Sequence, residues 1–200
     1  MLATLRADLE HAGRVNGLSG PGRWLKLAFH PGVHAVVAYR LASWSLRVRA
    51  PVVRHVLVAL ATLVRVVTER MTGVEISPRA EIGPGLVVHT GWGVFIATTR
   101  IGRNCVVQHG VSITHGVRGV GDDVYFGPGA KVIGRAAIGN NVRVVANSLV
   151  MTDVADDLTV VGVPARIRWR NRRATAASLL LVVGAALGVP DADGLLALIP

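Results

Sequence analysis

Aliphatic side chains recur at a nearly constant interval through the second half of the chain. Ten of the twelve steps between them are six residues and two are seven, and the positions are Ile76, Ile82, Val88, Val94, Ile101, Val107, Ile113, Val120, Phe126, Val132, Ile138, Val144 and Val150. An α-helix cannot keep this set on one face, because six residues turn through about 600°. The interval instead predicts a repeat architecture of short strands.

The six-residue period is typical of a β-solenoid, in which three hexapeptides form one triangular turn. Thirteen repeats predict about four turns, with the aliphatic side chain of each repeat pointing inward. Glycine follows the aliphatic residue at positions 83, 102, 121, 127 and 139, where we expect it to permit the backbone turn at a corner. The two seven-residue steps predict corner bulges near 97–100 and 116–119.

Three regions follow from this pattern. Residues 1–73 are expected to be helical: LRADLEHA is a short amphipathic piece, a helix runs through 35–48, and Pro51 starts another that Gly73 caps. Residues 74–165 form the predicted parallel β-helix domain. Residues 166–200 comprise a basic segment and an apolar C-terminal tail.

Composition narrows the classes of partner. The net charge is +10, but there is no lysine-rich run with interleaved aromatics, so we expect no nucleic-acid partner. A single cysteine, Cys105, excludes a disulfide framework and a four-cysteine zinc site, and its place in the repeat predicts a core residue. The N-terminus lacks the apolar run of a signal peptide. We therefore expect a cytoplasmic protein.

Two apolar stretches raise the question of a membrane. Residues 51–68 are interrupted by Arg54, His55 and Arg65, and residues 174–190 are uncharged but slightly short of the roughly 20 residues of a transmembrane span. These features favour helices that dock in a trimer or touch the membrane surface peripherally over helices that cross it.

Three segments resemble the serine acetyltransferase branch of the hexapeptide acyltransferases. They are PGVHAVVAYRLASW before the solenoid, EIGPGLVVHTGWGVFIATTRIGRNCVVQHGVSI within it, and IGNNVRVVANSLVMTDVADDLTVVGVPARI at its end. The resemblance implies a left-handed parallel β-helix, a homotrimer with active sites between adjacent solenoids, and acetyl-CoA as co-substrate. It also implies a histidine that acts as general base on the acceptor hydroxyl.

Three histidines lie in the predicted solenoid. His89 and His109 fall on the same wall in neighbouring turns, and His115 lies just past the next corner, so we expect all three to approach one lateral cleft. A neutral imidazole with an ordinary pKa of about 6.5 can take the proton of an attacking hydroxyl. Backbone N–H groups between Gly91 and Gly93 are candidates to stabilise the oxyanion. No metal is expected.

The chain departs from the family at two places. An ungapped match places Thr90 at the family's catalytic histidine and His89 at the preceding aspartate, so either the base has moved to His89 or another residue serves. Only HGVRGVGDD joins Ile113 to Val124, where serine acetyltransferases have a longer loop. Sugar and exopolysaccharide O-acetyltransferases have such short loops. A glycan or other small-molecule hydroxyl is therefore an alternative acceptor to serine.

The resemblance also implies where acetyl-CoA binds. By position, Gly127, Ala146 and Asn147 would line the groove for the pantetheine arm, and Gly162, Pro164 and Arg166 lie on the closing loop. The arginines at 166, 168, 170, 172 and 173 would meet the phosphates of CoA, or form a solvated stripe or a lipid-headgroup contact.

Two other classes stay open. Trimeric hexapeptide solenoids also include zinc carbonic anhydrases with three histidine ligands. The shifted histidine, in turn, would suit a catalytically inactive solenoid scaffold. Trp92 occupies a position that is usually small, so it either lines the pocket or fills a contact between helix and solenoid.

Overall fold

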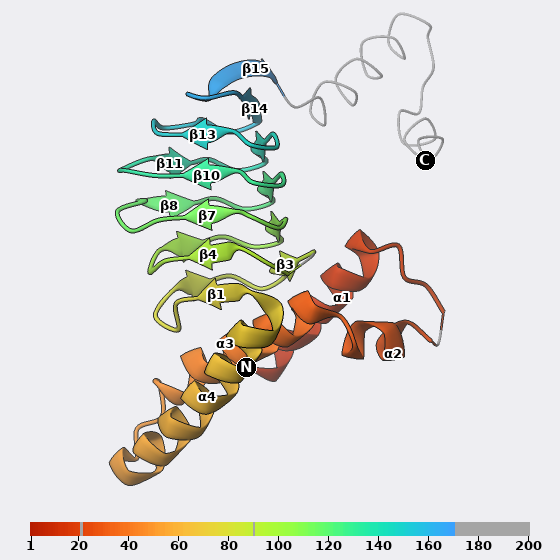
Figure 1. Cartoon of the computed structure of the whole chain (residues 1–200), viewed down its shortest axis with the longest axis vertical. Coiled ribbons are helices and arrows are strands. Elements are labelled where there is room, and N and C mark those ends of the chain that lie inside the picture. The colour runs from red at the N-terminus through yellow and green to blue at the C-terminus, as the bar shows by residue number, and fades with distance from the viewer. Residues whose placement is uncertain (21, 90, 171–200) are drawn as a thin grey trace, which may run out of the picture.

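The fold is a β-solenoid, a stack of turns that each contain short strands, with four helices at its N-terminal end (Figure 1). It is seen in a computed structural model that describes residues 1–20, 22–89 and 91–170. The predicted tail after residue 170 lies outside these described residues. A strand, β15, occupies Arg166–Arg170 at the start of the predicted basic segment.

Proline and glycine mark the ends of the long helices. The helices are α1 (Leu2–Val15), α2 (Arg23–Ala28), α3 (Pro31–Ser45) and α4 (Pro51–Thr72). Pro31 and Pro51 each occupy the first helical position, where the missing N–H has no partner to lose. Gly73 has a φ of 63° and caps α4 in the left-handed conformation, which confirms the predicted cap. Helix α2 was not predicted, because six residues carry too little periodicity.

The strands form three sheets, one on each side of a triangular prism. We name them sheet A, sheet B and sheet C. Sheet A contains β1 (Val74–Ile76), β4 (Val94–Ile96), β7 (Ser112–Ile113), β10 (Lys131–Val132) and β13 (Leu149–Val150). Sheet B contains β2 (Glu81–Ile82), β5 (Arg100–Ile101), β8 (Gly119–Val120) and β11 (Ala137–Ile138). Sheet C contains β3 (Val87–Val88), β6 (Val106–Val107), β9 (Tyr125–Phe126), β12 (Arg143–Val144), β14 (Leu158–Val161) and β15.

Neighbouring turns are in parallel register, as the repeat predicts. Val88 lies opposite Val107, and Val107 opposite Phe126. Among the strands of the described residues, only β15 runs antiparallel, against β14. Sheet A has five strands, so the solenoid makes about five turns and the estimate of four was too low.

The glycines that follow the aliphatic residues are needed for a different reason from the one predicted. Gly83, Gly102, Gly121 and Gly139 stack along one corner, and a Cβ on Gly121 would lie 2.7 Å from the carbonyl of Gly139. The positive φ angles instead occur two residues later on that corner, for example at Asn104. Close stacking, and not backbone conformation, therefore demands glycine at these four positions.

The first predicted bulge lies elsewhere in the structure. Ile96, not Val94, occupies the register position opposite Ile113, although both Val94 and Ile96 are buried. The extra residues are consequently in the five-residue corner 89–93, while the corner 97–99 is short. The second bulge, predicted near 116–119, is the five-residue corner 114–118.

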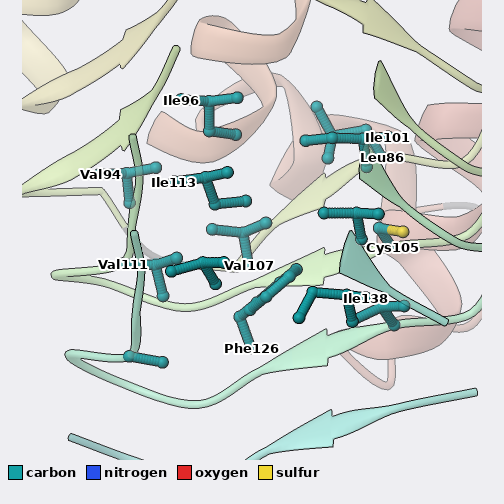
Figure 2. Packing of buried hydrophobic residues seen from close by; sticks show 14 of the residues in the cluster. Leu86, Val94, Ile96, Ile101, Cys105, Val107, Val111, Ile113, Phe126 and Ile138 are labelled. Atoms are coloured by element: carbon teal, nitrogen blue, oxygen red, sulfur yellow. The ribbon is translucent and has the colours of Figure 1, made fainter. Parts of the chain in front are cut away.

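The core is a column of aliphatic side chains inside the prism (Figure 2). Val107, Ile113 and Phe126 are fully buried there, which confirms the inward positions read from the repeat. Cys105 is also fully buried, and burial raises the pKa of its thiol to about 12. The core prediction for Cys105 is therefore confirmed.

A buried ion pair fastens the helices to the first turn of the solenoid. Arg40 on α3 donates to both carboxylate oxygens of Asp8 on α1, at 2.9 and 3.1 Å, and to the carbonyls of Ile82 and Gly83 at 2.6 Å. The Asp8 carboxylate also accepts from the backbone N–H of Gly85 at 2.7 Å. Because each partner has several hydrogen bonds, the pair can stay charged in the interior.

Candidate active site

The candidate site is the corner that joins sheet C to sheet A, which we call the C–A edge. It consists of residues 89–93, 108–111, 127–130 and 145–148 in successive turns. His89 and His109 lie here one turn apart, and Gly127, Ala146 and Asn147 continue the same edge. Backbone bonds run along it, from Gly129 N–H to the His109 carbonyl and from Asn147 N–H to the Pro128 carbonyl, each at 2.8 Å. Five of the predicted site residues therefore share one edge.

His89 is half-buried because the start of α3 packs against the end of β3. A Cβ on Gly32 would lie 1.8 Å from the Val88 carbonyl, so only glycine permits this approach. The approach brings His30, the N-cap of α3, beside His89, with ring centroids 6.5 Å apart. Among the described residues, the Nδ1 atoms of both rings are buried without a hydrogen-bond partner.

Burial, and then repulsion from His89, lowers the pKa of His30 below its ordinary value. His30 is therefore neutral near pH 7, and its ring places an uncharged wall beside His89.

His30 is the residue that the sequence did not single out. It is far from His89 in the chain, and no spacing rule links them. The one local signal is the sequence His30-Pro31-Gly32. Gly32 lies in the first turn of a helix, where glycine is unfavourable, and this indicates that another part of the chain approaches closely there.

His115 lies on a different corner, 114–118, between sheets A and B. Its ring is exposed and meets Phe95 edge-on at 6.3 Å. The same corner holds Arg118, which donates to the Asp153 carboxylate and to the Arg135 carbonyl. Within a single chain, the structure thus separates His115 from His89 and His109.

Trp92 occupies the long first corner of the C–A edge. Its φ of 75° is uncommon for a bulky residue, and its side chain is 69% exposed. A Cβ on Gly73 would lie 3.0 Å from the Trp92 ring, so the ring leans on the cap of α4. Thr90, at the start of this corner, lies outside the described residues.

The predicted closing loop reaches the far end of the same edge. Leu149 N–H donates to the Gly162 carbonyl at 3.0 Å, and Gly162 N–H donates to Ser148 Oγ at 3.1 Å. Pro164 and Arg166 follow and are exposed. All six residues predicted to bind the cofactor therefore lie at or next to the C-terminal half of the C–A edge. Of the predicted arginine stripe, Arg172 and Arg173 lie outside the described residues.

The remaining histidines contact backbone carbonyls. His11 Nδ1 lies 2.6 Å from the Gly85 oxygen, His34 Nε2 lies 2.5 Å from the Ala28 oxygen, and His55 Nδ1 lies 2.7 Å from the Pro51 oxygen. Over residues 1–20, 22–89 and 91–170, no three His, Cys, Asp or Glu side chains lie close enough to share a metal ion.

Comparison with curated proteins shows which family has a similar sequence. The serine acetyltransferase of Synechococcus elongatus is 39% identical over 179 residues, which cover 86% of this chain and 70% of the relative. The serine acetyltransferase of Helicobacter pylori strain J99 is 36% identical over 158 residues, covering 75% of this chain and 88% of the relative. The chain belongs to the serine acetyltransferase family. No family model matches it.

Solved structures agree with this assignment. The Neisseria gonorrhoeae serine acetyltransferase has a TM-score of 0.72 at 28% identity, over 88% of this chain and 69% of that one. The Brucella abortus enzyme, solved with coenzyme A, has a TM-score of 0.70 at 25% identity, over 84% of this chain and 67% of that one. The family's members are acetyl-CoA-dependent O-acetyltransferases, and this chain is an acyltransferase with their fold.

Proposed function

We propose that the chain transfers the acetyl group of acetyl-CoA to the hydroxyl of serine at the C–A edge. The observation that carries this proposal is the line of His89, His109, Gly127, Ala146 and Asn147 along one edge of the solenoid. A base and a narrow track of small residues are the two features that acetyl transfer from a thioester to an alcohol requires. We propose that the enzyme works in the cytoplasm.

His89 is the general base in this proposal. Its ring takes the proton as the acceptor oxygen attacks the thioester carbonyl, and it returns the proton to the departing thiolate of CoA. The backbone N–H groups of Gly91 and Gly93 are the candidate donors to the oxyanion, because the Trp92 N–H between them already donates to the Thr72 carbonyl at 2.6 Å. The neutral ring of His30 lies next to the ring of His89 in this arrangement.

The C-terminal half of the C–A edge suits the acyl donor. A Cβ on Gly127 would lie 2.7 Å from the Ala146 nitrogen, so the turns stack there without side chains between them. Ala146 and Asn147 are exposed, and so is Arg166 at the start of β15. An extended pantetheine arm can follow such a smooth edge, with an arginine for its phosphates.

The active unit in this proposal is a homotrimer. The exposed His115 contacts the half-buried Phe95 of β4 in sheet A, away from the edge that carries His89. When the edge of one solenoid lies against this wall of the next, His115 of the neighbour joins the site. The separation of His115 from the other two histidines within one chain is what this assembly explains.

A sugar or exopolysaccharide hydroxyl is the alternative acceptor. Two observations favour it: the corner that carries His115 is only five residues long, and the exposed Trp92 ring projects from the edge beside His89. An exposed indole can stack on the apolar face of a sugar ring, and a short corner leaves room for a large acceptor.

The test is release of free thiol from acetyl-CoA in the presence of serine, and separately of a panel of sugar and glycan hydroxyls. Release that saturates with serine supports the main proposal, whereas release with glycans alone selects the alternative acceptor. Trp92→Ala sharpens the distinction, because it should raise the KM for a glycan much more than the KM for serine. No release with any acceptor would leave an inactive scaffold as the better account.

A further inference from the structure

We propose that the outer face of α4 binds an anionic lipid surface. This inference does not depend on the proposed enzymatic activity. Within the described part of the chain, α4 is the one helix long and apolar enough to cross a membrane by length and composition. Its contacts, described next, indicate instead that it lies along the surface.

Helix α4 buries only Ala61 and Thr72, and most of its other side chains are exposed. Thr68 and the Arg65–Glu69 ion pair face α3 and the first strand, in a small cavity lined by Ala35, Ala38, Tyr39, Val74 and Ile76. The exposed side chains run the full length of the helix and are mainly Val52, Val53, Val56, Leu60, Leu63, Val64, Val66, Val67 and Met71. Arg54, His55 and Arg70 are exposed among them, but most of the exposed side chains are apolar, and a large exposed apolar surface on a folded protein marks an interaction site.

The position of α4 makes this face accessible. α3 and α4 form a hairpin that projects away from the solenoid at the N-terminal end of the stack (Figure 1). α3 covers one side of α4, and the opposite side meets no other described element along most of its length. A flat surface can therefore contact several turns of α4 at once.

The charge around the hairpin selects an anionic surface. No Asp or Glu occurs between Glu10 and Glu69, whereas the same stretch contains Arg14, Arg23, Lys26, Arg40, Arg47, Arg49, Arg54 and Arg65. Arg47, Arg49 and Arg54 are exposed at the hairpin tip, next to the exposed Trp44 and Leu46. Cations and an indole beside an apolar helix face are typical of helices at the lipid headgroup boundary.

A second copy of the chain fits these charges less well. Pairing two such hairpins at their tips would bring Arg47, Arg49 and Arg54 of both copies together, and their like charges would repel. Anionic headgroups neutralise the tip instead, while the acyl region accepts the valine and leucine side chains. The charge pattern thus favours lipid over self-association as the occupant of this face.

The experiment is sedimentation of the full chain with vesicles of phosphatidylglycerol mixed with phosphatidylcholine, compared with vesicles of phosphatidylcholine alone. We expect binding to the anionic vesicles that weakens with added salt. Replacing Arg47 and Arg49 by Glu should weaken it at least about tenfold. The control Arg79→Glu with Arg135→Glu makes the same charge change on the solenoid and should have much less effect.

The apolar contribution is tested by Leu60→Glu combined with Leu63→Glu, which should abolish vesicle binding and leave acetyl transfer and the oligomeric mass unchanged. Three results would overturn the proposal: equal binding to both kinds of vesicle, full binding by the α4 variant, or no vesicle binding by the wild type. A change in the oligomeric mass of the α4 variant, measured by light scattering, would show that a second copy covers this face.

Discussion

Single residues decide how closely the turns of the solenoid stack. The ladder of glycines on the corner between sheets B and C leaves no room for a methyl group, because the carbonyl of the next glycine occupies that space. The repeat itself could be read from the sequence, but this reason could not, since it depends on the distance between turns. The hydrophobic period predicts which side chains point inward, but it does not predict how closely the corners of successive turns pack.

Gly121→Ala should therefore lower the free energy of unfolding by about 1–3 kcal/mol, as overpacking does elsewhere. Gly22→Ala is the matched control, because a Cβ there would meet nothing within 4 Å. Chemical denaturation of both variants measures the difference. Equal stability of the two variants would contradict the stacking explanation.

At the same scale, His89 is the most consequential residue. His89→Ala should lower acetyl transfer at least about 100-fold through loss of a general base, with the fold and oligomeric mass retained. His55→Ala, at an exposed site on α4, should retain full activity. Steady-state thiol release measures both, and an active His89→Ala enzyme would move the role of base to another residue.

His30 makes stability depend on pH. Because its pKa is lowered in the folded protein, the unfolded chain binds a proton more readily, and stability should fall as the pH drops below about 6.5. His30→Gln removes this group and should flatten that part of the curve of unfolding free energy against pH. If the His30→Gln variant kept the same slope of unfolding free energy against pH, burial of the His30 ring would not be the cause of the pH dependence.

At the scale of elements, the helices and strands follow from the sequence better than their connections do. Pro51 and Gly73 predicted where α4 begins and ends, and the six-residue period predicted the strands. The long corner 89–93 was misplaced because Val94 and Ile96 are both buried, so the interval alone could not tell which residue is in register with the next turn. That corner carries His89, so the site was harder to predict than the core.

The docking of the helices was not predictable from periodicity, since Asp8 and Arg40 look like ordinary charged residues of helices. Arg40→Met should cost about 3–5 kcal/mol of stability, because it leaves the buried Asp8 carboxylate without its partner. Arg47→Met, an exposed change on the same segment, should stay within about 0.5 kcal/mol. Thermal and urea unfolding compare the two, and equal costs would show that the ion pair does not fasten the helices.

At the scale of the whole molecule, the solenoid places its chemistry along one edge. The edge begins at His89, where the helices pack, and ends at the closing loop near Gly162, so the proposed base and the proposed donor track lie on one line. The parallel stacking of turns produces this line from residues spread over the entire second half of the chain. The six-residue repeat and the family resemblance were enough to predict that these residues share one edge, whereas the packing of α3 and His30 against His89 required the structure.

A crystal structure of the chain with coenzyme A tests the central claim most directly. We expect the pantetheine arm to lie along Gly127, Ala146 and Asn147, with the sulfur beside His89 and the wall of a neighbouring subunit closing the groove. Coenzyme A bound on another wall, with its sulfur remote from His89, would contradict the account.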